Sequence, residues 1–227
     1  MKILVTAATG AEMALSIKHI AASVREENPM VFRTKGHEIV FAVTEVGMVA
    51  TAYHLTRLLA AVKYDLVIQV GIAGSFDRNI PLGDTCLVRS DRFADMGAED
   101  GETYIDVFDL GLADANERPF TDKILENPYR EDQLGTGLKE VKAITMNTVT
   151  GHEATAKRLD GAYGCELESM EGAAFHYVCL QEQVMFVQVR AVSNYIEQRN
   201  RAGWRIDEAL ANLNGWLVRY LTAKTML

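Results

Sequence analysis

The chain is poor in cysteine and contains no long hydrophobic run. Its cysteines are odd in number, lack a CxxC spacing and lie among apolar residues: Cys86, Cys165 and Cys179. This pattern argues against a disulfide framework and favours a reducing, cytoplasmic setting. No apolar run is long enough to span a bilayer. The short apolar run at the N-terminus meets Gly10 and Glu12, so we expect a first strand there rather than a signal peptide.

Basic side chains are also outnumbered. The chain has 23 lysines and arginines against 31 aspartates and glutamates, a formal charge of -8. This balance argues against a nucleic-acid-binding surface and against a polybasic membrane anchor. We therefore expect small molecules, or copies of the same chain, as partners. With 48% hydrophobic residues, residues 1–227 are predicted to form one domain around one sizeable core.

Several signatures of catalytic or cofactor sites are missing. The histidines show neither HExxH nor another ligand spacing, so no metal is predicted, and no serine lies in a GxSxG elbow. The opening "ILVTAATGAEM" lacks the dinucleotide fingerprint because Ala7 and Met13 occupy two of its three glycine positions. Glu12 would also repel a pyrophosphate at a helix N-terminus. We therefore expect no cofactor and disfavour an oxidoreductase.

Strand-like runs and helical segments alternate along most of the chain. Strands are predicted at Lys2–Ala7, His37–Gly47, Asp65–Ser75, Gly83–Val88, Val141–Met146 and Val184–Asn194. Helices are predicted from Gly10 up to a break at Asn28–Pro29, and at Val49–Val62, Glu153–Leu159, Met170–Gln181 and Ile206–Thr222. This alternation predicts an α/β sandwich of three layers. The stretch Arg92–Tyr129 is predicted to form long irregular loops.

Two polar side chains stand where a strand run meets the next segment. Glu171 begins the small-residue helix of "SMEGAAF", and Asn194 is expected just past a buried strand. Ligands of open α/β sheets bind outside the carboxyl ends of the strands. We therefore predict that Glu171 and Asn194 together bind one small polar molecule. A nucleoside suits the pair, because a carboxylate binds two sugar hydroxyls and an amide binds a base edge. Simpler alternatives are a strand-ending turn at Asn194 and, at Glu12, a charge favoured by the helix dipole.

Four motifs together resemble the purine nucleoside phosphorylase and nucleosidase superfamily, nearly end to end. They are "GIAGS" at 71–75, "GDTCLV" at 83–88, "ESMEGAAF" at 168–175 and "RAVSN" at 190–194. The hydrolytic branch, the methylthioadenosine/S-adenosylhomocysteine nucleosidases, has glutamate where Glu12 stands and Met-Glu where Met170-Glu171 stands. It has Ser-Asp where this chain has Ser193-Asn194. That departure, with "SNYIEQRNRAGWRIDEA", resembles the futalosine hydrolase family, which cleaves hypoxanthine from futalosine in a menaquinone pathway.

The resemblance implies a nucleoside phosphorylase-like α/β/α sandwich with a central mixed sheet, and an enzyme that hydrolyses an N-glycosidic bond. It implies that Glu12 is the general base and that Glu171 binds the ribose hydroxyls above Met170. Asn194 would face a 6-oxopurine base, for which an amide has matching donors and acceptors. The first loop, Thr6–Met13, has no arginine or lysine to bind phosphate, so hydrolysis is favoured over phosphorolysis.

Several assignments stay open. An adenine-releasing methylthioadenosine/S-adenosylhomocysteine nucleosidase is the nearest alternative, and a non-catalytic nucleoside-binding protein is an alternative of another class. Trp204 is predicted to cover the 5' side of the sugar or to be ordinary core, and Ser75 to contact the nucleoside or to satisfy a turn. Arg199 and Arg201 are either partners of a substrate carboxylate or solvated surface. The resemblance also implies a homodimer or higher oligomer in which Arg92–Tyr129 covers a neighbouring pocket.

Overall fold

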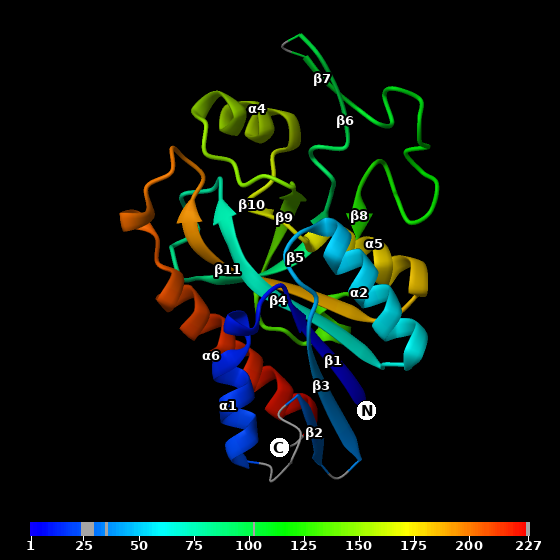
Figure 1. The fold of residues 1–227 in the computed structure, drawn as a ribbon, viewed down its shortest axis with the longest axis vertical. Coiled ribbons are helices and arrows are strands. Elements are labelled where there is room, and N and C mark those ends of the chain that lie inside the picture. The colour runs from blue at the N-terminus through cyan, green and yellow to red at the C-terminus, as the bar shows by residue number, and fades with distance from the viewer. Residues whose placement is uncertain (24–29, 35, 102, 226–227) are drawn as a thin grey trace.

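A mixed β-sheet with helices on both faces forms the molecule, as the computed structural model of residues 1–23, 30–34, 36–101 and 103–225 shows (Figure 1). Among these residues the order of the main sheet is β2-β3-β1-β4-β11-β5-β9-β10, with β8 paired to β5. The strands are β1 (Lys2–Ala7), β2 (Val31–Thr34), β3 (His37–Val43), β4 (Leu66–Ser75), β5 (Thr85–Asp91), β8 (Leu125–Glu126), β9 (Lys139–Thr145), β10 (Leu167–Ser169) and β11 (Phe186–Tyr195). The predicted α/β class with a central mixed sheet is confirmed.

Helices cover the two faces of this sheet in separate groups (Figure 1). They are α1 (Ala14–Ser23), α2 (Met48–Ala61), α3 (Glu131–Leu134), α4 (Glu153–Tyr163), α5 (Gly172–Glu182) and α6 (Ile206–Thr225), with 3-10 turns η1 (Gly10–Glu12) and η2 (Arg201–Gly203). Helices α1 and α6 pack together on one face and α2 and α5 on the other. No helix in the described ranges is long and apolar enough to cross a membrane.

Strands β4, β11, β5, β9 and β10 close into a ring. The short strand β10 pairs in parallel with β9 and antiparallel with β4, which joins the two ends of this part of the sheet. Small and apolar side chains fill a separate core here, among them Ala73, Val88, Val141, Leu167 and Val192. Because the ring places the ends of β10, β4 and β11 side by side, residues distant in sequence meet at one edge.

The predicted strands and long helices are present, with two differences. The stretch Arg92–Tyr129 is not wholly irregular, because β6 (Gly97–Asp100) and β7 (Thr103–Asp106) form an antiparallel ribbon and β8 joins the main sheet. Strand β6 reads "GAED" and is exposed throughout, so it carries no alternating apolar signal. The short elements β2, β10 and α3 were also missed. The helix break predicted at Asn28–Pro29 lies outside the described residues.

A buried histidine connects α5 to the short strand β8. His176 is fully buried, and its Nδ1 donates to the carbonyl oxygen of Leu125 in β8 at 2.9 Å. Complete burial lowers the pKa of His176 to about 3, because the protonated ring would be desolvated. The native protein therefore keeps this ring neutral at pH values where the unfolded chain has already bound the proton.

We predict that His176 makes the protein less stable as the pH falls below about 6.5. Below about pH 6.5 the unfolded state binds a proton that the native state does not. The free energy of unfolding therefore drops as the pH falls, until the pH reaches the native pKa of His176, about 3. The variant His176→Gln lacks this linkage. As the pH falls from about 6.5, the difference in unfolding free energy between the wild type and the variant should narrow by about 1.4 kcal/mol per pH unit. Urea titration at several pH values measures it. A gap independent of pH contradicts the assignment.

Candidate active site

A cavity of about 330 Å³ opens where β1, β4 and β11 end and α5 begins. Its wall is mostly apolar, with Val46, Ile72, Val149, Met170, Trp204, Ile206 and Leu210, and its polar side chains include Glu12, Glu168, Glu171 and Asn194. Five of the six predicted site residues line it: Glu12, Met170, Glu171, Asn194 and Trp204. An apolar cavity with a few convergent polar groups is typical of a small-molecule site.

Three backbone or hydroxyl donors hold the carboxylate of Glu12. Its Oε2 accepts from the backbone N–H of Thr9 at 2.9 Å and from the Thr9 hydroxyl at 3.0 Å. Its Oε1 accepts from the backbone N–H of Ile72 in β4 at 3.2 Å. The local turn η1 and the neighbouring strand thus fix this acid at the cavity wall, where it is 8% exposed.

Glu171 is the N-cap residue of α5 and bridges two other elements. Its Oε1 accepts from the backbone N–H of Gly47 at 3.1 Å, and its Oε2 accepts from Nη1 of Arg190 at 3.3 Å. Gly47, the N-cap residue of α2, has φ of 93°, a conformation that favours glycine. The carboxylate is therefore held between the start of α2 and strand β11.

Arg190 is a site residue that the sequence interpretation missed. It lies in the middle of β11, is 1% exposed, and donates from Nη2 to Oε1 of Gln69 in β4 at 2.8 Å. A buried charge needs a partner, and Glu171 is that partner. The sequence does contain a signal for this pairing. Arg190 is a charged residue inside the apolar run "VMFVQVRAVSN", and Gln69 is an amide inside "DLVIQVGIAGS". Both strands are covered on both faces, so such polar residues point to internal pairing.

A second buried network fixes the first turn of α5. The hydroxyl of Thr145 accepts from the backbone N–H of Ala173 at 2.7 Å and donates to Asp91 at 2.9 Å. The hydroxyl of Ser169 accepts from the backbone N–H of Gly172 at 3.2 Å. Burial raises the pKa of Asp91 to about 6. These bonds satisfy helix N–H groups that otherwise lack partners, and they set the position of Glu171 at the helix start.

Asn194 is the penultimate residue of β11, inside the strand rather than just past its end. Its Nδ2 donates to the carbonyl oxygen of Tyr195 at 3.0 Å, and its Oδ1 accepts from the Ser193 hydroxyl at 2.8 Å. The carbonyl oxygen can only accept, so this contact fixes which amide atom is the nitrogen. One N–H and one lone pair remain for a ligand in the cavity.

Ser75 is the predicted site residue that the structure does not bring to this cavity. It is 1% exposed, and its hydroxyl lies 2.9 Å from the carbonyl oxygen of Asp77 and 3.1 Å from that of Glu166. The hydroxyl thus satisfies the turn that follows β4, which is the alternative role considered for it. Within the described part of the chain, no group of three or more His, Cys, Asp or Glu side chains is arranged to hold a metal ion.

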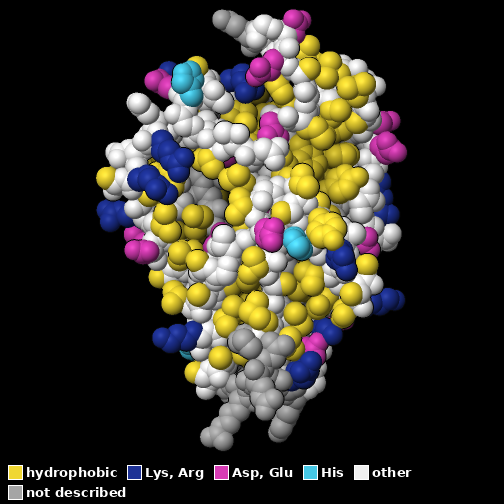
Figure 2. Space-filling model, in the orientation of Figure 1, with side chains coloured by type: hydrophobic (Ala, Val, Ile, Leu, Met, Phe, Trp, Pro, Cys, Tyr) yellow, Lys and Arg dark blue, Asp and Glu magenta, His cyan; other side chains and the backbone are white. Residues whose placement is uncertain are grey.

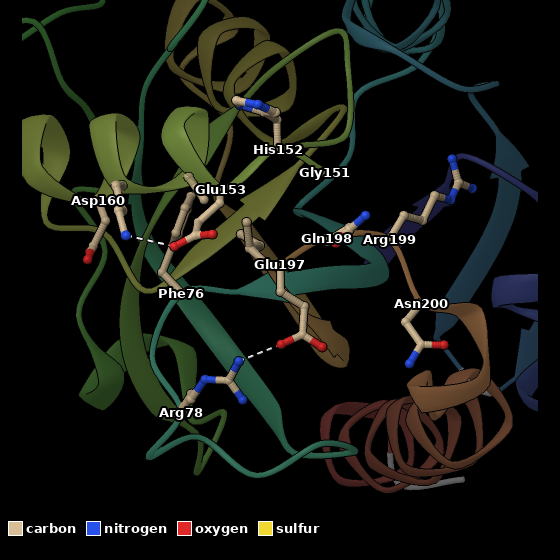
Figure 3. A pocket seen from close by; sticks show the side chains of 13 residues that line it. Phe76, Arg78, Gly151, His152, Glu153, Asp160, Glu197, Gln198, Arg199 and Asn200 are labelled. Atoms are coloured by element: carbon tan, nitrogen blue, oxygen red, sulfur yellow. Dashed lines mark hydrogen bonds and ion pairs between the residues drawn. The ribbon is translucent and has the colours of Figure 1, made fainter.

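Trp204 of the cavity lies against Arg199, which lines a wider surface cleft. The guanidinium carbons of Arg199 and Arg201 lie 5.3 and 5.8 Å from the centre of its ring. The cleft, shown in Figure 3, has a volume of about 880 Å³ and shares Ile196 with the cavity. In it Arg78 pairs with Glu197. Among the described residues no carboxylate pairs with Arg199 or Arg201, so both remain candidates for an anionic group.

The chain matches known proteins along nearly its whole length. A family model described as the phosphorylase superfamily matches residues 2–221. Futalosine hydrolase of Thermus thermophilus is 31% identical over 205 residues, which cover 88% of this chain and 90% of that protein. A 5'-methylthioadenosine/S-adenosylhomocysteine nucleosidase of Colwellia psychrerythraea is 27% identical over 169 residues, 70% of this chain and 68% of its own. The chain therefore belongs to the phosphorylase superfamily and, within it, to the futalosine hydrolase family.

A solved structure supports the fold independently. The structure of a futalosine hydrolase mutant of Helicobacter pylori aligns with a TM-score of 0.81, covering 98% of this chain and 99% of that chain. At 17% sequence identity this likeness concerns the fold alone.

Proposed function

We propose that this protein hydrolyses the N-glycosidic bond of futalosine, a step of menaquinone biosynthesis by the futalosine pathway. The products are hypoxanthine and dehypoxanthine futalosine. The observation that carries the proposal is the convergence of Glu12, Glu171 and Asn194 on one cavity. Family membership supports it, because the Thermus thermophilus relative is a futalosine hydrolase.

Glu171 acts on the sugar. Cleavage of a glycosidic bond passes through an oxocarbenium-like sugar, which a nearby negative charge stabilises. A carboxylate fixed by Gly47 and Arg190 has lone pairs left to accept the 2'- and 3'-hydroxyl protons. Met170, in the cavity wall beside it, packs beneath the sugar.

Glu12 acts on the attacking water. The C1'–N9 bond breaks with its electron pair passing to the base, while the water oxygen bonds to C1' and its proton passes to Glu12. A Cβ at Gly71 would lie 3.0 Å from Oε1 of Glu12 and 2.3 Å from Nη1 of Arg190. Glu12 and Arg190 therefore approach the same glycine.

Asn194 acts on the leaving base. Its Nδ2 donates to O6 of hypoxanthine, and its Oδ1 accepts from N7 once that atom is protonated. An amide does not titrate, so the N7 proton comes from solvent, and the base leaves as a neutral molecule. Adenine has an amino group in place of O6. This amino group is a hydrogen-bond donor and would face the N–H donor of Asn194 with no acceptor between them. This argument separates the proposal from the adenine-releasing alternative, to which the 27% identical nucleosidase points.

We predict that the purified protein releases hypoxanthine from futalosine in the absence of phosphate and acts more slowly on methylthioadenosine. Glu12→Gln should lower kcat by about a hundred- to ten-thousand-fold, the usual contribution of a general base. Chromatography of the products measures both effects.

Asn194→Asp should lower kcat/KM for futalosine relative to that for methylthioadenosine.

Each contrary result in this assay rejects a different part of the proposed function. Strict phosphate dependence contradicts hydrolysis, and faster adenine release contradicts the role of Asn194. Binding of hypoxanthine with no turnover would indicate the non-catalytic alternative. Ser75→Ala serves as a matched control, because the Ser75 hydroxyl satisfies a turn outside the cavity.

We further propose that the protein works in the cytoplasm as a homodimer. The three cysteines are free and buried, which fits a reducing compartment. Apolar side chains lie exposed near the cavity, with Val46 and Val149 in its wall and Val49 82% exposed at the start of α2. Figure 2 shows hydrophobic side chains gathered on the upper right of the molecule. Such a patch supports an interface beside the site.

We predict that Val49→Glu shifts the protein from dimer to monomer, because a charge would be buried in an apolar interface. Light scattering after size-exclusion chromatography measures the mass. Leu15→Glu is the matched control: Leu15 is also exposed, at 52%, but lies on α1. A dimer that persists in Val49→Glu, or a wild-type protein that is monomeric, contradicts this interface.

A further inference from the structure

Glu168 is a buried carboxylate in the cavity wall that the proposed reaction does not yet use. It lies in β10, is 4% exposed, and precedes Met170 and Glu171 by two and three residues. Burying a carboxyl group is unfavourable unless it gains hydrogen bonds. Because the carboxylate also lines the cavity, a ligand bound there can supply a further hydrogen bond beyond those made within the protein.

The sheet register places Glu168 opposite Asn194. Gly74 of β4 pairs with Glu168 on one side and with Asn194 on the other. Directly paired residues of neighbouring strands point to the same face of a sheet, so the carboxyl group and the amide flank the surface above Gly74. A Cβ at Gly74 would lie 3.3 Å from Nδ2 of Asn194 and 2.9 Å from Ile196, so glycine keeps this surface open.

Thr150 holds Glu168 without exhausting its acceptors. The backbone N–H of Thr150 donates to Oε1 at 2.8 Å, and its hydroxyl donates to Oε2. A carboxylate has about four lone-pair sites, so each oxygen retains one. Burial raises the pKa of Glu168, while the two bonds from Thr150 oppose that rise. A further donor from a ligand would also favour the charged form.

We propose that Glu168 accepts the N1–H of the 6-oxopurine base and so sets base specificity together with Asn194. This rests on the proposed function and names the recognised edge of its substrate. Along that edge the purine presents N7, O6 and N1–H in order. Asn194 binds N7 and O6, and Glu168, on the opposite side of β4, binds N1–H.

This arrangement rejects adenine at a second atom. N1 of adenine carries a lone pair and no hydrogen, so it would face a carboxylate oxygen with no donor between them. A site built to hydrogen-bond a substrate group discriminates strongly against an analogue that lacks it, because its own polar atom is left unpaired. Glu168 and Asn194 together then distinguish the two purines at N1 and at the C6 substituent.

The test compares Glu168→Gln with the wild type in binding three bases: hypoxanthine, adenine and 1-methylhypoxanthine, in which a methyl group replaces the N1 hydrogen. Glutamine keeps the length of the side chain and an oxygen for Thr150, and its amide can donate to N1 of adenine. Calorimetry should show hypoxanthine binding weakened by about tenfold or more in the variant, with 1-methylhypoxanthine little changed and adenine improved. Glu166→Gln is the matched control, because Glu166 lies two residues away and is not part of the cavity wall.

Two features keep the test decisive. If Glu168→Gln fails to fold, the wild type alone decides, because equal binding of hypoxanthine and 1-methylhypoxanthine overturns the proposal. In a folded variant, unchanged preference among the three bases also overturns it. Futalosine turnover is measured separately. Wild-type protein that fails to cleave futalosine but shows the Glu168-dependent preference rejects the proposed reaction and retains the base contact. Normal futalosine turnover with no Glu168-dependent preference retains the proposed reaction and rejects the base contact.

Discussion

The buried ion pair between Arg190 and Glu171 is the interaction on which the site depends. Both side chains are almost wholly enclosed; Arg190 lies in β11, and Glu171 is the N-cap residue of α5. Removing one partner would leave the other as an uncompensated buried charge, at a cost of about 3–5 kcal/mol. Arg190 also binds Gln69, so one guanidinium links the two central strands to the start of the helix. The carboxylate is thereby held in place before any ligand arrives.

The rest of the site follows from how the sheet closes. Because β10 pairs with both β9 and β4, the chain entering α5 is forced against the ends of β4 and β11. This places Glu168, Glu171 and Asn194 around one cavity, while the turn η1 after β1 supplies Glu12. Glycines at 71 and 74 leave room for the polar side chains that cross the sheet. Strands and the ends of helices, rather than long loops, carry the polar groups of the site, which favours their precise positioning.

Much of this could be predicted from the sequence, for identifiable reasons. The long strands are apolar runs, and Glu12, Glu171 and Asn194 lie at element ends within recognisable motifs. Arg190 and Asp91 could not be placed, because their partners depend on strand order, which local patterns do not specify. Strand β10 has three residues, too few for a periodic signal, so both the ring closure and the position of Glu168 were missed. Ser75 shares a motif with Gly74, yet its hydroxyl satisfies the following turn.

The most direct measurement of the central claim is a double-mutant cycle of Arg190→Gln and Glu171→Gln, with kcat/KM for futalosine as the readout and urea unfolding as the check on folding. If Arg190 acts by holding Glu171, the two residues form one unit. Once either is replaced, replacing the other should lower kcat/KM by less than about threefold further. Two losses that simply multiply would show that the residues act independently, and would contradict the account.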